Sequence, residues 1–96
     1  MKAIILITDS EAMREFERVL AVEGHNGFTV VPAAAGSGRH GLKTGDRVHP
    51  GSSSLMLTMA DANRAEPLLE LLRRTRDAAG FRENTRMWSF EVDEMA

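Results

Sequence analysis

The chain has 96 residues, of which 43% are hydrophobic and 27% are charged, and its formal net charge is −2. This length fills one hydrophobic core, so we expect a single domain over 1–96, and the composition excludes a disordered tail. The absence of cysteine excludes disulfides, thiolate metal sites and thiol chemistry. No apolar run approaches the about 20 residues of a membrane span, so we expect no membrane insertion. With no cysteine, a cytoplasmic location is the default expectation.

The first two predicted elements are a buried strand and an amphipathic helix. Residues 2–8, KAIILIT, are apolar and β-branched without alternation, which is typical of a strand covered on both faces. Apolar residues then recur at helical spacing, which predicts a helix over about 11–23. They are Met13, Phe16, Val19 and Leu20. The candidate capping residues are Thr8 with Glu11, Ser10 as a rival, and Gly24 after the helix.

A second strand is predicted at 27–33, GFTVVPA, and Pro32 indicates a sheet edge because it cannot donate a hydrogen bond to a neighbouring strand. The segment that follows is rich in glycine, serine, histidine and basic residues, and we expect a long flexible loop at about 34–52. Three basic residues and one acidic residue lie in 33–54, whereas the rest of the chain is acidic. This distribution favours one small bound anion and argues against nucleic acid, which needs an extended basic face.

The remaining elements are a strand, a helix and a strand. Residues 54–60, SLMLTMA, are apolar on both parities, and a leucine-rich helix then runs to Gly80. Asn63 with Glu66 matches a capping pattern, which would place Pro67 in the first turn. The last strand, 87–92, alternates, with Trp88, Phe90 and Val92 on one face.

The order β-α-β-β-α-β predicts an α+β ferredoxin-like fold, a four-stranded antiparallel sheet with two helices on one face. In that topology the first and third strands are central and the second and fourth are edges, and the sequence agrees, because the first and third strands are apolar on both parities. Ile5, Ile7 and Met56 are expected on the face without helices. Burial of that face would be favourable at about 25 cal/mol per Å², which predicts a homo-oligomer packed sheet against sheet. The alternative is a small apolar face left in solvent.

The loop composition predicts an anion site. Glycines on either side of Ser37 let backbone N–H groups approach an anion, and Arg39 adds a planar fork that matches phosphate oxygens. The candidate binding residues are Gly36, Ser37, Gly38, Arg39, His40, Lys43 and Arg47. The alternative is a surface loop that binds nothing.

These same residues carry a resemblance to a known family. GFTVVPAAAGSGRHG, 27–41, resembles the strand and loop entry of the PII signalling proteins, which run Gly-x-Thr-Val and then Gly-x-Gly-Arg-Gln. The matching positions are Gly27, Thr29, Val30, Gly36, Gly38 and Arg39, with one extra residue between the two blocks. The architecture is similar over nearly the whole chain, and the specific motif covers about 27–40.

The resemblance implies a regulator rather than an enzyme. It implies a homotrimer with an adenine nucleotide (AMP, ADP or ATP) in each cleft between neighbours, and a loop that engages a partner protein such as a transporter or an enzyme. Gly36, Gly38 and Arg39 would lie at the phosphates, and Thr29 near the base. His40 stands where the family's glutamine helps to hold a metal and a keto-acid.

The chain departs from the family in two places. The family's second phosphate loop is glycine-rich and contains a lysine, whereas AAGFRENTRMW has one glycine, with Arg82 and Arg86 as its cations. The sequence also ends at Ala96, without the family's arginine-bearing C-terminal extension. We therefore expect a smaller ligand than a triphosphate: a mono- or diphosphate nucleotide, another anion, or a metal.

Metal binding is the alternative function. The trimeric CutA-type proteins share this architecture and are associated with divalent metals, and His40 and His49, with Asp46, offer nitrogen and oxygen ligands. His25 is expected to be a turn residue. Catalysis at Thr8-Asp9-Ser10 is not expected, because helix capping explains these residues. RNA recognition is not expected either, because the two central strands carry no aromatic residues for base stacking.

Overall fold

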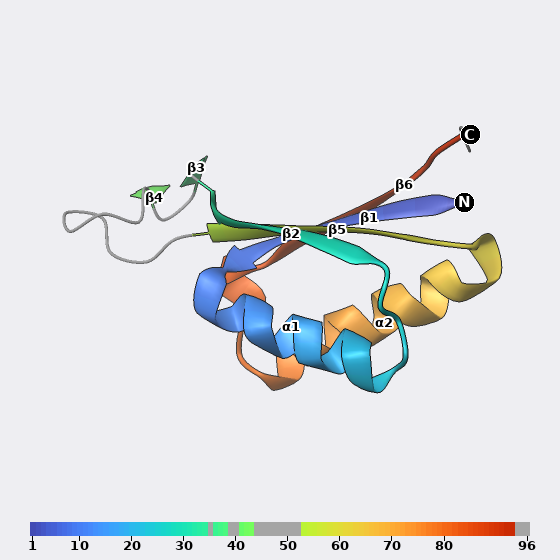
Figure 1. Cartoon of the computed structure of the whole chain (residues 1–96). Coiled ribbons are helices and arrows are strands. Elements are labelled where there is room, and N and C mark those ends of the chain that lie inside the picture. Colours follow the sequence, from blue (N-terminus) through green and yellow to red (C-terminus); the bar gives the residue numbers. More distant parts are fainter. Residues whose placement is uncertain (35, 39–40, 44–52, 94–96) are drawn as a thin grey trace.

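Four strands form an antiparallel sheet in the order β2-β5-β1-β6. The strands and the two helices are β1 (Lys2–Asp9), α1 (Ser10–Val22), β2 (Phe28–Ala34), β5 (Ser53–Ala60), α2 (Ala62–Ala78) and β6 (Arg86–Glu91). The computed structural model describes residues 1–34, 36–38, 41–43 and 53–93. The order confirms the predicted ferredoxin-like fold, with β1 and β5 at the centre and β2 and β6 at the edges (Figure 1).

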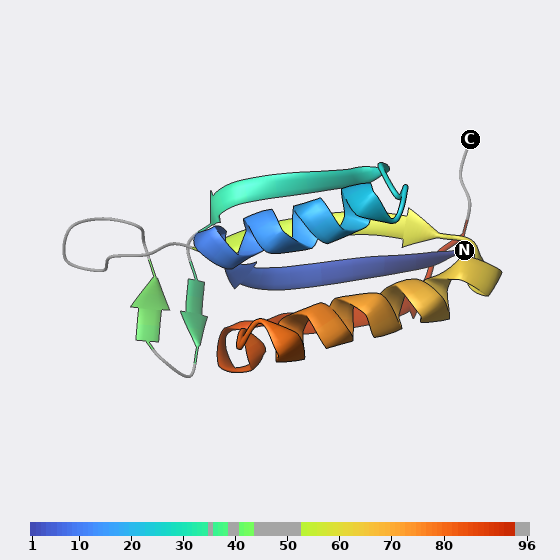
Figure 2. The same cartoon turned by 90° about the horizontal axis from the view of Figure 1, so that it is seen from below.

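Two short elements were not predicted. A hairpin of β3 (Gly36–Gly38) and β4 (Gly41–Lys43) forms a separate two-stranded sheet inside the segment expected to be a loop. It lies beyond the end of the main sheet, where β2 ends and β5 begins (Figures 1 and 2). The second element is a 3₁₀ turn, η1 (Arg82–Asn84), before β6.

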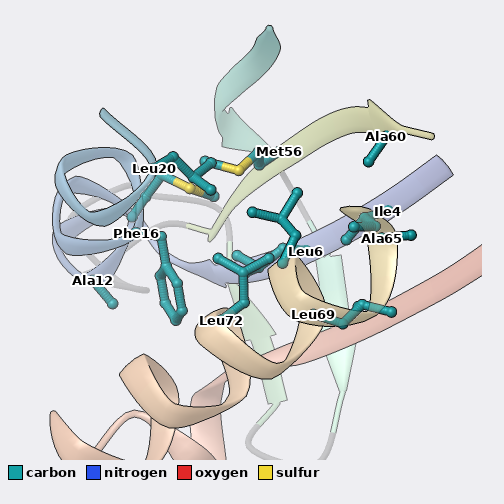
Figure 3. Packing of buried hydrophobic residues seen from close by; sticks show 12 residues of the cluster. Ile4, Leu6, Ala12, Phe16, Leu20, Met56, Ala60, Ala65, Leu69 and Leu72 are labelled. Atoms are coloured by element: carbon teal, nitrogen blue, oxygen red, sulfur yellow. The ribbon is translucent and has the colours of Figure 1, made fainter. Parts of the chain in front are cut away.

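Both helices cover the same face of the sheet, side by side and in opposite directions (Figure 2). Each presents an apolar stripe with the spacing of helical turns to the even-numbered residues of β1 and β5 (Figure 3). The stripes are Ala12, Met13, Phe16 and Leu20 in α1, and Ala65, Leu68, Leu69 and Leu72 in α2. They enclose Ile4, Leu6 and Met56, so the core lies between the helices and the sheet.

The two helices end at the glycines that the sequence predicted. Gly24 and Gly80 have φ of +80° and +76°, in the left-handed region. The next residue in each case bonds back across the last turn, His25 N–H to the Leu20 carbonyl and Phe81 N–H to the Arg76 carbonyl, both 2.9 Å. Each helix therefore ends in a Schellman motif.

The predicted N-caps were wrong. The caps are Asp9 and Asp61, so α1 begins at Ser10 and α2 at Ala62. Thr8 remains in β1. Pro67 is consequently the sixth residue of α2, beyond the first turn.

The odd-numbered residues of β1, β2 and β5 and the even-numbered residues of β6 lie on the face of the sheet that the helices leave uncovered (Figure 1). Its exposed apolar side chains are Val31 (50%), Leu57 (36%), Met59 (46%), Trp88 (49%) and Phe90 (45%). Ile5 and Ile7 lie on it, as predicted, because they pair with Leu57 and Leu55. Met56 was wrongly placed there: it has even parity, and its side chain is 1% exposed in the core. We call this surface the helix-free face.

Candidate ligand site

The β3–β4 hairpin brings together several of the predicted anion-binding residues. Gly36 pairs with Lys43, and Ser37 pairs with Leu42, in an antiparallel register. The Gly-Ser-Gly backbone therefore runs beside the backbone of the strand that carries Lys43. Four other predicted residues lie outside the described residues: Arg39, His40, Arg47 and His49.

Thr29, predicted to approach a nucleotide base, lies on β2, apart from the hairpin. It pairs with Leu57 and is exposed, so its side chain belongs to the helix-free face. The structure thus separates the predicted residues into two groups, the hairpin beyond the sheet and Thr29 on the sheet itself.

Hydroxyl groups gather at the end of the sheet nearest the hairpin. Ser54 pairs with Thr8 across β5 and β1, and the Thr8 hydroxyl bonds to that of Thr85 at 2.8 Å. Ser10, the first residue of α1, shares a second 2.8 Å hydroxyl bond with Ser54. We call this group of Thr8, Ser10, Ser54 and Thr85 the hydroxyl cluster.

Arg86 is the cation of β6 at this same end. It pairs with Ile7, is exposed, and has the parity of Trp88, so its side chain lies on the helix-free face. Its Nη1 donates to the Thr85 carbonyl at 3.2 Å. The predicted strand began at residue 87 and so did not include Arg86. The alternation of Arg86, Trp88 and Phe90 could have shown that Arg86 shares a face with the two aromatic residues.

Thr29 and Arg86 lie on opposite edge strands. β5 and β1 separate β2 from β6, so with strands about 4.8 Å apart the two positions are roughly 14 Å apart across the sheet. They are also displaced along the strands, because Arg86 is level with Val31 and not with Thr29. One small anion cannot touch both within a subunit. The two edges can meet over such a ligand only where neighbouring subunits come together.

His25 is more than a turn residue. The Thr58 hydroxyl donates to the Gly27 carbonyl at 2.6 Å, and since its single proton is used there, it must accept from His25 Nε2–H, also 2.6 Å away. Burial, with the nearby Arg64 charge as the second cause, lowers the pKa of His25 below its ordinary value. The imidazole therefore holds the α1–β2 turn against β5.

Metal binding through the loop histidines remains a prediction. Within the described part of the chain, no group of three or more histidine, aspartate or glutamate side chains is arranged to hold a metal. The proposed ligands His40, Asp46 and His49 all lie outside it.

Solved structures of a PII-like protein are similar to this chain. Two are of CPII, a nitrogen regulatory PII-like protein from Thiomonas intermedia K12 bound to ADP, AMP and bicarbonate, at 19% identity. Their TM-scores are 0.67 and 0.63, and the matches cover 95% and 96% of this chain and 86% and 93% of theirs. A third, CPII bound to ADP and bicarbonate, has 19% identity, a TM-score of 0.66, and coverage of 95% and 86%. At this identity the likeness shows the fold.

No curated protein matches the chain. Among the described residues, no helix has both the length and the apolar character needed to cross a membrane. The model of the family named nitrogen regulatory protein P-II matches residues 1–95, nearly the whole sequence, and confirms the resemblance carried by the Gly-x-Thr-Val and Gly-x-Gly-Arg positions. The chain therefore belongs to the P-II family.

Proposed function

We propose that this P-II family member is a regulator that binds a small anionic effector, an adenine nucleotide, in clefts between subunits. It signals to a partner protein, a transporter or an enzyme, through the segment 34–52. The observation that carries this proposal is the position of the β3–β4 hairpin, with Gly36 paired to Lys43 beyond the sheet end. The ADP and AMP bound to the structurally similar CPII support the choice of nucleotide.

In this proposal the phosphates bind to the glycine-rich segment. Backbone N–H groups of Gly36, Ser37 and Gly38 donate to phosphate oxygens, because glycine leaves the backbone accessible. The cationic side chains of Arg39, Lys43 and Arg47 neutralise the charge, and Arg39 binds two oxygens at once. His40 lies next to them in sequence and completes the phosphate side.

The sheet supplies the remaining contacts, Thr29 near the base and Arg86 as a cation from the segment that corresponds to the family's second phosphate loop. Thr29 of one subunit lies on the β2 edge and Arg86 of the next on the β6 edge, and both belong to the helix-free face. Packing of these faces in a homotrimer would bring the two edges together around one nucleotide. The exposed apolar side chains of that face give the trimer its driving force.

Ligand binding then acts as a switch. An effector that binds only the ordered form of 34–52 shifts the population toward that form, which presents a surface to the partner that the free form lacks. The protein needs no catalytic residue for this function.

Calorimetric titration of the full chain with AMP, ADP and ATP, each with and without bicarbonate, tests the proposal. We expect binding of at least one nucleotide at one site per subunit. Arg39→Ala should weaken it by about tenfold or more, because a charge-assisted bidentate pair is lost.

Glu17→Ala, on α1 and so on the other side of the sheet from the helix-free face, is the control and should bind as the unmodified chain does. The same titration with zinc, copper and nickel examines the alternative. Metal binding that is lost on His40→Ala or His49→Ala, with no response to any nucleotide, would replace our proposal with the CutA-like one.

A further inference from the structure

Within the hydroxyl cluster, the hydrogen-bonded pair Thr8 and Thr85 lies directly beside Arg86 in β6. Thr8 and Thr85 are each 1% exposed, and they lie 77 residues apart in the chain. They come from β1 and from the residue that precedes β6. Their 2.8 Å hydroxyl bond is therefore a long-range contact buried beneath the sheet, on the helix side.

This contact extends the pairing of β1 with β6 by one position. The last backbone pair of that ladder is Ile7 with Arg86, and the same antiparallel register places Thr8 opposite Thr85 next. The hydroxyl bond joins the two strands at the point where their backbone ladder ends.

The pair also determines which way Arg86 faces. Thr85 has an extended backbone, with φ −122° and ψ 131°, so successive side chains alternate between the two faces of the sheet. With Thr85 held on the helix side, Arg86 must lie on the helix-free face. A slip of one residue in β6 would turn Arg86 toward the helices and Thr85 toward solvent.

Local sequence alone does little to prevent that slip. The 3₁₀ turn Arg82–Asn84 that leads into β6 contains no buried residue. β6 is an edge strand, and Met87 is its half-buried residue on the core side. Phe81, just before this turn, also packs against the core. Among the described residues at the entry to β6, the Thr8–Thr85 bond adds a buried polar contact to these apolar ones.

We propose that the Thr8–Thr85 hydroxyl pair is a positioning contact that fixes the entry of β6 and directs Arg86 to the cleft between subunits. The positioning step stands on the geometry of the single chain. Its consequence for ligand affinity rests on the function proposed above.

Amide hydrogen exchange of the ligand-free protein tests the positioning step. In Thr85→Val, which keeps the shape but removes the hydroxyl, the amides of residues 86–88 should exchange about fivefold to tenfold faster. Thr85→Ser keeps the hydroxyl and should retain most of the protection.

Thr58→Val is the matched control. Thr58 is 2% exposed and is hydrogen-bonded, but its partners are His25 and Gly27. It should leave residues 86–88 unchanged. Equal effects of Thr85→Val and Thr58→Val on residues 86–88, or no effect of either, would overturn the proposal.

A double-mutant cycle with ADP tests the consequence. Thr85→Val should weaken ADP binding by about fivefold to tenfold in the unmodified chain, and by much less in the Arg86→Ala variant, because the pair acts through Arg86. Full additivity would overturn the link to Arg86. If the unmodified chain binds no nucleotide, the proposed function fails, and the exchange experiment still decides whether the pair positions β6.

Discussion

Single hydroxyl groups decide several local features of this protein. Thr8 and Glu11 match a capping box, yet the Thr8 hydroxyl is bonded to Thr85, far away in sequence. Local spacing cannot reveal such a partner, because only the pairing of β1 with β6 brings the two together. The capping prediction was therefore wrong for a tertiary reason.

His25 makes the free energy of unfolding depend on pH. The pKa of His25 is lower in the folded state than in the unfolded state, where it is about 6.5. At pH values between these two pKa values, the unfolded chain binds more protons than the folded chain. The free energy of unfolding should therefore fall as the pH is lowered below about 6.5, and should be fully retained above it.

Urea unfolding from pH 5 to 8, at one protein concentration, measures this dependence. His25→Gln, whose side-chain amide also donates to Thr58, should flatten the curve below pH 6.5. A curve of the same slope in both proteins would show that other groups cause it.

At the scale of elements, the sequence predicted most of the architecture. β1 and β5 are central, as the apolar residues on both of their parities predicted, and Pro32 correctly indicated that β2 is an edge strand. The helical stripes in α1 and α2 were equally clear. The β3–β4 hairpin was missed because Gly-Ser-Gly has low strand propensity, and its pairing with 41–43 has no signal in apolar periodicity.

The Schellman glycines give a test at this scale. Gly80→Ala should lower the free energy of unfolding by about 1 kcal/mol, because φ is +76° there and a Cβ disfavours that conformation. Nothing lies within 4 Å of the added Cβ, so the cost is one of backbone conformation and not of a clash.

Gly27→Ala is the control, since its Cβ also meets open space and its φ is not left-handed. We expect a change of less than about 0.5 kcal/mol there. Urea denaturation measures both variants. An equal loss at the two positions would contradict the backbone argument.

At the scale of the whole molecule, the ligand site was only partly predictable. The composition of 34–52 pointed to Gly36 and Lys43 as candidate binding residues, because glycine and basic residues gather there, but it did not reveal that they lie opposite each other in a hairpin. Arg86 and the hydroxyl cluster required the pairing of strands from both ends of the chain. The sequence also predicted that the helix-free face packs against another subunit. Met56 was assigned to that face wrongly, because β5 is apolar on both parities and its pattern does not show which parity faces the core.

Leu57→Glu tests the trimer and the site together. Leu57 lies on the central strand β5, and in the middle of the helix-free face it neighbours Ile5 and Thr29 by strand pairing. A single subunit leaves it 36% exposed, so a carboxylate can stay hydrated there, whereas a packed interface would bury the charge at a cost of several kcal/mol. Val22→Glu, on α1 at a position that is 74% exposed, is the control.

The most direct measurement of our central claim is ADP binding by these two variants, with their masses determined by sedimentation at the same concentration. We predict that Val22→Glu remains a trimer and binds ADP as the unmodified chain does, and that Leu57→Glu sediments as a monomer and loses ADP binding. A monomeric Leu57→Glu that binds ADP with unchanged affinity would contradict a site formed between subunits.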